Sequence, residues 1–145
     1  MKVVITSLVL LLALIGINCR SAPTKKTDSP TIVKTAGVSE ISPAQARPGV
    51  EAAYSQFVDV RTPEEFASGH ANRARNIPLD SLAANLDMLE KNEPVYLICH
   101  SGNRSKKAAQ ILVDNGFSQA ISIAGGMEAW QAAGLPMATE SSVTK

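Results

Sequence analysis

The chain of 145 residues has little of several features that would point directly to a function: it contains two cysteines, two histidines and few aromatic residues. Fourteen lysines and arginines stand against thirteen aspartates and glutamates, and no basic run is longer than two residues. This balance excludes the basic surface that nucleic-acid binding requires, so we expect no nucleic acid as a partner. The few scattered cysteines and histidines show no metal-ligand spacing, and we expect no metal site and no cofactor.

The first nineteen residues have the features of a secretory signal. Lys2 precedes an apolar run over 3–17, which is shorter than the roughly twenty residues that span a bilayer. Cys19 follows this run and is similar to the lipidated cysteine of bacterial lipoproteins, although Asn18 stands where that motif usually has Gly, Ala or Ser. We expect residues 1–18 to be a signal peptide and Cys19 to carry a lipid that tethers an exported, periplasmic protein to the membrane of the bacterial cell envelope. Cleavage nearby by an ordinary signal peptidase and an uncleaved anchor are the alternatives.

The remaining chain is long enough for one domain with one hydrophobic core. Residues 19–35 are rich in Ser, Thr, Pro and Lys and are predicted to be a flexible tether without secondary structure. One domain is predicted over 36–138, and a disordered tail over 139–145. We expect this domain to be a monomer.

Short apolar runs alternate with helix-like segments throughout the predicted domain. The first helix begins after Ser42, a plausible N-cap, and Pro48-Gly49 is expected to disturb it. The other predicted elements are strands at 57–60, 95–98 and 120–123, an extended segment at 76–79, and helices beginning at 63 and spanning 81–89, 104–115 and 127–133. This alternation predicts an α/β fold with a mainly parallel central sheet of about five strands and helices on both faces. Ligands bind such sheets at the carboxyl ends of the strands.

The most informative segment is 99–105, with the sequence Cys-His-Ser-Gly-Asn-Arg-Ser, which follows the predicted strand at 95–98 and precedes a predicted helix. Backbone N–H groups and the positive end of the helix dipole converge at such a junction and stabilise a thiolate. Cys99 is therefore a candidate nucleophile. The alternative is an inert core cysteine. The nucleophile interpretation requires loop amides directed at Cys99 and a side chain that is not sealed inside the core.

Six pieces of the chain share their order with a known family over about 100 residues, from near Gly37 to Pro136. They are Asp59-Val60-Arg61 with Glu65-Phe66, Gly69-His70, Asn76-Ile77-Pro78-Leu79, the loop 99–105, Gly125-Gly126-Met127 with Trp130, and Gly134-Leu135-Pro136. In these pieces the chain resembles the single-domain rhodaneses, which are thiosulfate and persulfide sulfurtransferases. It departs from them at 71–75, where the family commonly has a Pro-Gly turn.

The resemblance implies a rhodanese-like fold and a sulfurtransferase that uses Cys99 as its catalytic residue. In rhodaneses this cysteine takes a sulfane sulfur from a small-molecule donor such as thiosulfate, holds it as a persulfide, and passes it to a thiophilic acceptor such as cyanide or a thiol. Consecutive loop N–H groups would hold the terminal sulfur, and Gly102 supplies the backbone freedom that a tight ring needs.

The resemblance also suggests roles for the residues around Cys99. We expect the persulfide or the substrate to be bound by the rest of the loop, which comprises His100, Ser101, Gly102, Asn103, Arg104 and Ser105. Arg104 in particular is expected to bind the anionic end of the donor. Asp59 and Arg61 match the family's strand-end motif and are expected to brace the loop through an ion pair or hydrogen bonds.

Two other functions remain open from the sequence. Many rhodanese-like domains lack the cysteine and only bind partners, so a non-catalytic binding module is one alternative. Phosphatases and arsenate reductases of the Cys-x5-Arg type are a second alternative, but the spacing of Cys99 and Arg104 is Cys-x4-Arg, and the shorter ring suits a single sulfur atom better than a tetrahedral oxyanion.

Overall fold

The computed structural model describes residues 33–35 and 38–139. The predicted signal peptide over 1–18 and the predicted lipidation site Cys19 lie outside the described residues, as does the predicted tail from residue 140 onward. Within the described part, no helix has both the length and the apolar character needed to cross a bilayer.

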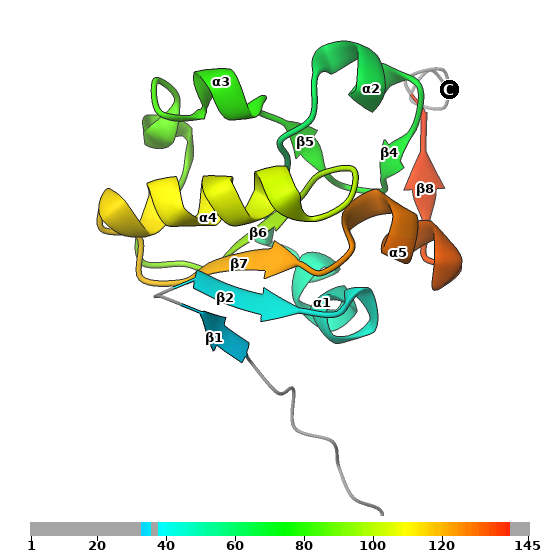
Figure 1. The fold of residues 1–145 in the computed structure, drawn as a ribbon, viewed down its shortest axis with the longest axis horizontal. Helices are drawn as coiled ribbons and strands as arrows, with labels where there is room; N and C mark the ends of the chain where they lie inside the picture. The colour runs from blue at the N-terminus through cyan, green and yellow to red at the C-terminus, as the bar shows by residue number, and fades with distance from the viewer. Residues whose placement is uncertain (1–32, 36–37, 140–145) are drawn as a thin grey trace, which may run out of the picture.

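A six-stranded sheet forms the centre of the domain, with the strand order β1-β2-β7-β6-β3-β5 (Figure 1). All neighbouring strands are parallel except β1, which pairs antiparallel with β2. This confirms the predicted parallel sheet of five strands. The strands are β1 (Val33–Thr35), β2 (Val38–Ile41), β3 (Gln56–Asp59), β5 (Arg75–Asn76), β6 (Val95–Ile98) and β7 (Ala120–Ile123).

Helices cover both faces of this sheet, as predicted. One face packs against α3 (Leu79–Leu82) and α4 (Asn103–Asp114), and the other against α1 (Pro43–Val50) and α5 (Gly126–Ala132). The remaining elements are α2 (Pro63–Ala67), the 3-10 turn η1 (Leu86–Met88), and a small antiparallel pair of β4 (His70–Ala71) with β8 (Met137–Ala138).

The alternation of side chains along each strand divides the core into two clusters. In β3, Phe57 packs toward α1 and α5, whereas its neighbour Val58 packs toward α3 and α4. Trp130 is buried against Phe57, with ring centroids 5.4 Å apart, and its indole N–H donates to the carbonyl of Pro136. Because strands buried on both faces need apolar residues at consecutive positions, the fully apolar run at 95–98 occupies an interior strand, β6.

Three predictions of local structure are wrong. The tether predicted over 19–35 ends too late, because residues 33–35 form β1 against β2. The helix predicted over 81–89 is divided into α3 and η1, and the side chain of Asn85 donates to the carbonyl of Ser81 between them. Pro48-Gly49 does not end α1, which continues to Val50; a Cβ at Gly49 would overlap the phenol of Tyr96, so this glycine serves close packing.

Candidate active site

The carboxyl ends of three neighbouring parallel strands meet around Cys99. Asp59 ends β3, Cys99 directly follows β6, and Ala124-Gly125 connects β7 to α5. The loop after β6 leads into α4 at Asn103, so the helix begins beside the thiol (Figure 1). This is the place where the sequence predicts a ligand site.

Two backbone amides of the loop are directed at the sulfur of Cys99. The N–H of Gly102 donates to Sγ at 3.1 Å and the N–H of Ser105 donates to it at 3.3 Å. Gly102 adopts φ +97°, a conformation that L side chains rarely adopt, and this geometry turns its amide toward the thiol. N–H donors stabilise a negative charge on sulfur, so the first requirement of the nucleophile interpretation is met.

The thiol lies beneath the loop and is 1% exposed. It packs within the core cluster on the α4 face, so burial alone does not separate it from an inert core cysteine. The residues above it differ from a core, however, because His100, Ser101 and Asn103 are exposed. The exposed part of the loop therefore lies on the solvent side of the thiol, whereas the thiol itself is covered.

A buried hydroxyl pair lies behind the thiol. The hydroxyl of Ser105 is 3.6 Å from the Cys99 sulfur, donates to the carbonyl of Gly102 at 2.9 Å, and is 2.8 Å from the hydroxyl of Ser122. Ser105 and Ser122 are both fully buried. The Ser122 hydroxyl therefore fixes the hydroxyl that is nearest to the sulfur.

The start of α5 holds the other side of the loop. The N–H of Met127 donates to the carbonyl of Cys99 at 2.7 Å, and the N–H of Glu128 donates to that of His100 at 3.2 Å. A Cβ at Gly126 would overlap both carbonyls, so only glycine allows α5 to approach this closely. The loop is therefore fixed between the beginnings of two helices.

Arg104 is paired with a carboxylate. Its two terminal nitrogens donate to the two carboxylate oxygens of Glu65 at 2.6 and 2.7 Å. The hydrogen bonds from Arg104 lower the pKa of Glu65 from 4.5 to about 2, and those same bonds raise the pKa of Arg104. The guanidinium that the sequence predicts as a binder of the anionic donor is thus already neutralised by a residue of α2.

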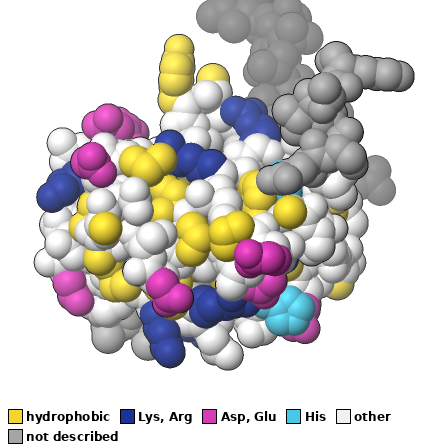
Figure 2. Space-filling model, turned by 90° about the horizontal axis from the view of Figure 1, so that it is seen from above, with side chains coloured by type: hydrophobic (Ala, Val, Ile, Leu, Met, Phe, Trp, Pro, Cys, Tyr) yellow, Lys and Arg dark blue, Asp and Glu magenta, His cyan; other side chains and the backbone are white. Residues whose placement is uncertain are grey.

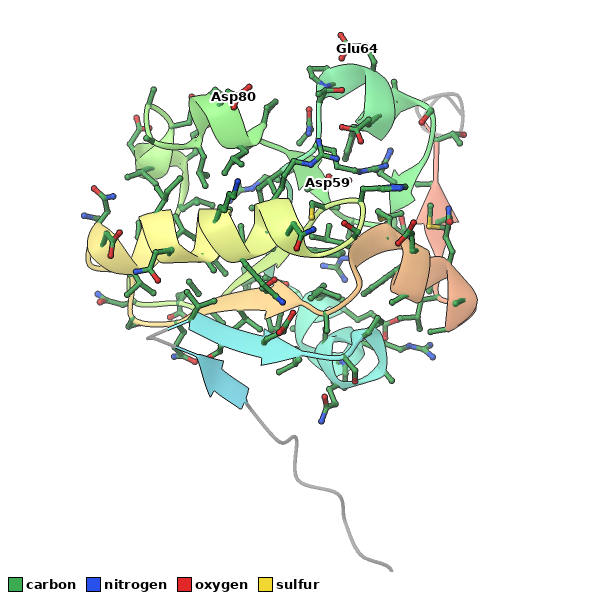
Figure 3. All side chains as sticks on the ribbon, viewed as in Figure 1. Asp59, Glu64 and Asp80 are labelled. Carbon is green, nitrogen blue, oxygen red and sulfur yellow. The ribbon has the colours of Figure 1, made fainter. Side chains whose placement is uncertain are left out.

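Asp59 and Arg61 form the expected ion pair, and both side chains are buried. The guanidinium of Arg61 donates to both carboxylate oxygens of Asp59 at 2.7 to 3.0 Å, and also to the carbonyl of Gly69 at 2.8 Å. Figure 3 shows Asp59 beneath α2, whereas Glu64 lies on the outer side of that helix. Among the described residues, the pair has no hydrogen bond to the loop 99–105, so it braces the segment between β3 and β4 beside the loop.

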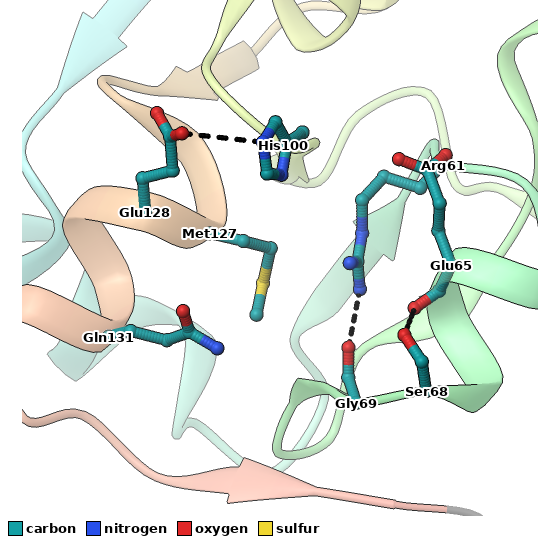
Figure 4. A pocket seen from close by; sticks show the side chains of 8 residues that line it. All are labelled: Arg61, Glu65, Ser68, Gly69, His100, Met127, Glu128 and Gln131. Carbon is teal, nitrogen blue, oxygen red and sulfur yellow. Dashed lines mark hydrogen bonds and ion pairs between the residues drawn. The ribbon is translucent and has the colours of Figure 1, made fainter.

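An open pocket of about 300 Å³ adjoins the loop (Figure 4). His100 contributes to its wall from the loop, and its Nε2 is 3.3 Å from a carboxylate oxygen of Glu128. The other lining residues come from the segment 61–69 and from α5, and they are Arg61, Glu65, Ser68, Gly69, Met127, Glu128 and Gln131. No group of three or more His, Cys, Asp or Glu side chains suited to a metal ion occurs within 33–35 and 38–139.

The sequence did not single out Glu65, Ser122 or Glu128 as site residues. Glu65 completes the helix-capping box with Thr62, and this local role is sufficient to explain a glutamate at position 65. The sequence therefore gives no sign that Glu65 also binds Arg104, 39 residues later. Ser122 has a detectable signal, because a hydroxyl in the otherwise apolar strand 120–123 needs a buried partner. The contact of Glu128 with His100 has no comparable local signal.

Comparison with known proteins finds relatives that are named thiosulfate sulfurtransferases. Thiosulfate sulfurtransferase GlpE of Actinobacillus pleuropneumoniae is 36% identical over 100 residues, which cover 69% of this chain and 93% of the relative. GlpE of Vibrio cholerae is 36% identical over 98 residues, covering 68% of this chain and 91% of the relative.

Solved structures show the same fold. A rhodanese-like domain protein from Staphylococcus aureus is similar with a TM-score of 0.58 and 39% identity, covering 63% of this chain and 89% of that one. A rhodanese-related protein from Thermoplasma volcanium has a TM-score of 0.63 and 30% identity, covering 70% and 98%. Residues 42–133 match the rhodanese-like domain as a family. The chain therefore belongs to the family of rhodanese-like domains.

Proposed function

We propose that the protein is a sulfurtransferase that moves a sulfane sulfur from thiosulfate or a related small donor to a thiophilic acceptor through a persulfide on Cys99. The observation that carries this proposal is the pair of amides, from Gly102 and Ser105, that donate to the Cys99 sulfur. The relatives named thiosulfate sulfurtransferase support the reaction type.

In the first half of the reaction the Cys99 thiolate attacks the outer sulfur of the donor. With thiosulfate, a new S–S bond forms on Cys99, the S–S bond of thiosulfate breaks, and sulfite leaves with the bonding electron pair. The two amides stabilise the attacking thiolate. In the product, a persulfide on Cys99, the negative charge is on the outer sulfur.

In the second half a thiol or cyanide attacks the outer sulfur of the persulfide, and Cys99 leaves as a thiolate. The backbone N–H groups of Ser101, Asn103 and Arg104 have no acceptor among residues 33–35 and 38–139. These loop amides are the candidates to hold the negative outer sulfur between the two steps.

The alternatives have less support. A phosphatase or arsenate reductase of the Cys-x5-Arg type needs a free arginine around its oxyanion, whereas Arg104 is occupied by Glu65. A binding module has no need for a thiol held by two amides. Both alternatives predict that no sulfur is acquired from thiosulfate.

The deciding experiment is intact mass spectrometry of the purified full chain before and after incubation with thiosulfate. We expect a gain of one sulfur atom, removed again by cyanide with release of thiocyanate. Cys99→Ser and Cys99→Ala should abolish the gain, whereas Cys19→Ser, which removes the other thiol, should retain it. An unmodified wild-type mass at millimolar thiosulfate and polysulfide would refute the proposal.

We also propose export and lipidation at Cys19, on the sequence features of residues 1–19 alone. The mass of the protein isolated from the envelope of its native cells tests this directly. An acylated Cys19 as the new N-terminus is the expected result, and a protein that retains residues 1–18 in the cytoplasm would contradict it.

A further inference from the structure

We propose that the pocket beside the loop selects the acceptor by charge, taking small cationic aminothiols in preference to anionic thiols, with Glu65 and Glu128 as the specificity-determining residues. The inference rests on the proposed sulfur transfer. It concerns which thiol removes the sulfur from Cys99, a question that the loop amides leave undecided because they contact only sulfur.

The two arginines beside the loop are both neutralised. Arg61 is buried, and its positive charge is neutralised by Asp59, to which it donates hydrogen bonds of 2.7 to 3.0 Å. Arg104 is 34% exposed and is held by both carboxylate oxygens of Glu65, itself 35% exposed. The bidentate pair occupies the edge formed by the two terminal nitrogens and offsets the charge of the guanidinium, which weakens its attraction for a carboxylate or sulfonate of a ligand.

Glu128 is the carboxylate of the pocket that lacks a permanent cationic partner. Its contact is His100, 3.3 Å away, which carries a charge only when it is protonated. Its side chain is 62% exposed at the opening, and Figure 4 shows it on the α5 side of the pocket, opposite Arg61. When His100 is neutral, the site holds three carboxylates against two arginines, and the excess negative charge resides at the opening.

On the face shown in Figure 2, acidic and basic side chains are interspersed rather than gathered by sign. Selection by charge therefore depends on the groups at the opening, within about one Debye length, or ~10 Å, of a bound thiol. The side chain of Met127 lies in the same wall and can contact the short carbon chain of such a thiol.

The transfer step balances without any further reactant. The acceptor thiolate attacks the outer sulfur of the Cys99 persulfide, forming a new S–S bond, and the bond to Cys99 breaks. Its electron pair returns to Cys99 as the thiolate, and the acceptor leaves as an organic persulfide. An acceptor bound in the pocket would have an ammonium group attracted to Glu128 and a carboxylate repelled by it, and an anionic donor such as thiosulfate meets the same repulsion during loading.

The test is single-turnover transfer from full-length protein already loaded with sulfur, so that the loading step does not enter the rate. The acceptors are cysteamine, 2-mercaptoethanol and 3-mercaptopropionate, which share a two-carbon spacer and carry a positive, no and a negative group. Rates are corrected for the thiolate fraction of each thiol. We expect cysteamine to exceed 3-mercaptopropionate about three- to fivefold at low salt, and about 0.5 M salt should remove most of this preference.

Three variants assign the preference to residues. Glu65→Gln frees Arg104, leaves two carboxylates against two arginines and should abolish the preference, and glutamine at this position still completes the capping box with Thr62. Glu128→Gln should likewise abolish the preference. Glu64→Gln removes the same charge from the neighbouring residue of α2, which does not line the pocket, and should leave the order unchanged.

The outcomes separate the two proposals. Failure to load sulfur overturns the sulfurtransferase function and this inference with it. Normal loading followed by equal transfer to the three thiols overturns the charge selection alone. An effect of Glu64→Gln as large as that of Glu65→Gln also overturns it, because net charge rather than the pocket would then decide.

Discussion

The two ends of the parallel sheet use similar side chains in different ways. At the carboxyl end, arginines bind carboxylates: Arg61 binds Asp59, and Arg104 binds Glu65. At the amino end, around the start of β3, Arg73 donates to the carbonyls of Glu51 and Ala52. Arg75 likewise donates to a backbone carbonyl, that of Met88.

The different partners of the arginines distinguish the carboxyl end, which is the candidate active site, from the amino end, where the arginines have a structural role. An arginine bound to backbone carbonyls fixes the path of the chain and keeps its full charge, which solvent screens. A pair of arginine and carboxylate cancels its charge and sets the local field in which a ligand binds. The amino end also exposes Tyr54 almost fully, at 96%, and within the described part of the chain it has no thiol that accepts from backbone amides.

The largest expected difference between the two ends concerns stability. Asp59→Ala leaves the Arg61 guanidinium buried with only the Gly69 carbonyl, and we expect a loss of about 3–5 kcal/mol in the free energy of unfolding. Arg73→Ala removes an exposed arginine at the amino end and should cost no more than about 1 kcal/mol. Urea denaturation of both variants measures this. Equal losses would show that the two ends do not differ in the way proposed.

The next effect concerns the hydroxyl pair behind Cys99. Ser105→Ala leaves the buried Ser122 hydroxyl without its partner, whereas the Gly102 carbonyl keeps the N–H of Lys106, so we expect about 1–3 kcal/mol of destabilisation and about tenfold slower alkylation of Cys99. Ser55→Ala is the matched control at the amino end, because the buried Ser55 hydroxyl has no partner within the described part of the chain.

A double variant separates the loss of stability, which comes from an unpartnered Ser122 hydroxyl, from the loss of Cys99 reactivity, which comes from the missing Ser105 hydroxyl. Ser105→Ala with Ser122→Ala removes both hydroxyls and should recover part of the stability without recovering the reactivity of Cys99. If stability does not return, or if Ser55→Ala slows alkylation equally, the hydroxyl pair has no specific role at the thiol.

The smallest effect concerns the pH dependence of the Glu65–Arg104 pair. Folding lowers the pKa of Glu65 from 4.5 to about 2, so the folded protein binds this proton less readily than the unfolded chain. The pair therefore stabilises the protein above about pH 4.5, and this contribution is lost as the pH falls toward 2. Because both side chains are about a third exposed, we expect about 1 kcal/mol or less.

Glu65→Gln measures this contribution. The difference in unfolding free energy between the wild type and the variant should be constant from pH 7 to about 5 and shrink below pH 4.5. Glu64→Gln serves as the reference. A difference that grows as the pH falls would contradict the assigned shift.

Much of the fold was predictable because the signals are local. The apolar runs at 95–98 and 120–123 coincide with β6 and β7, and α2 begins at residue 63 as predicted, with Thr62 as its N-cap. The single helix predicted over 81–89 is instead the short helix α3 followed by η1, although Leu82 and Leu89 are both buried. Burial of leucines at helical spacing does not require an unbroken helix between them.

The location of the candidate nucleophile was also predictable, but its surroundings were less so. Cys99 was placed at a strand end before a helix because a buried strand, a glycine and a helix start follow one another in the sequence. Its 1% exposure was not predictable, since the covering residues come from several elements. The pairing of Arg104 with Glu65 differs from the expected contact with a donor, although Arg104 does adjoin the pocket through Glu65.

The sequence by itself determined the family, the mainly parallel sheet and the position of Cys99 in a loop between a buried strand and a helix, because each is carried by short motifs whose residues are close together in the chain. Only the tertiary structure decided which charges cancel and which remain. Glu65 meets Arg104 across 39 residues, Ser122 meets Ser105 across 17, and Glu128 meets His100 across two strand ends. Electrostatic interaction depends on distance in space, and local sequence patterns do not encode that distance.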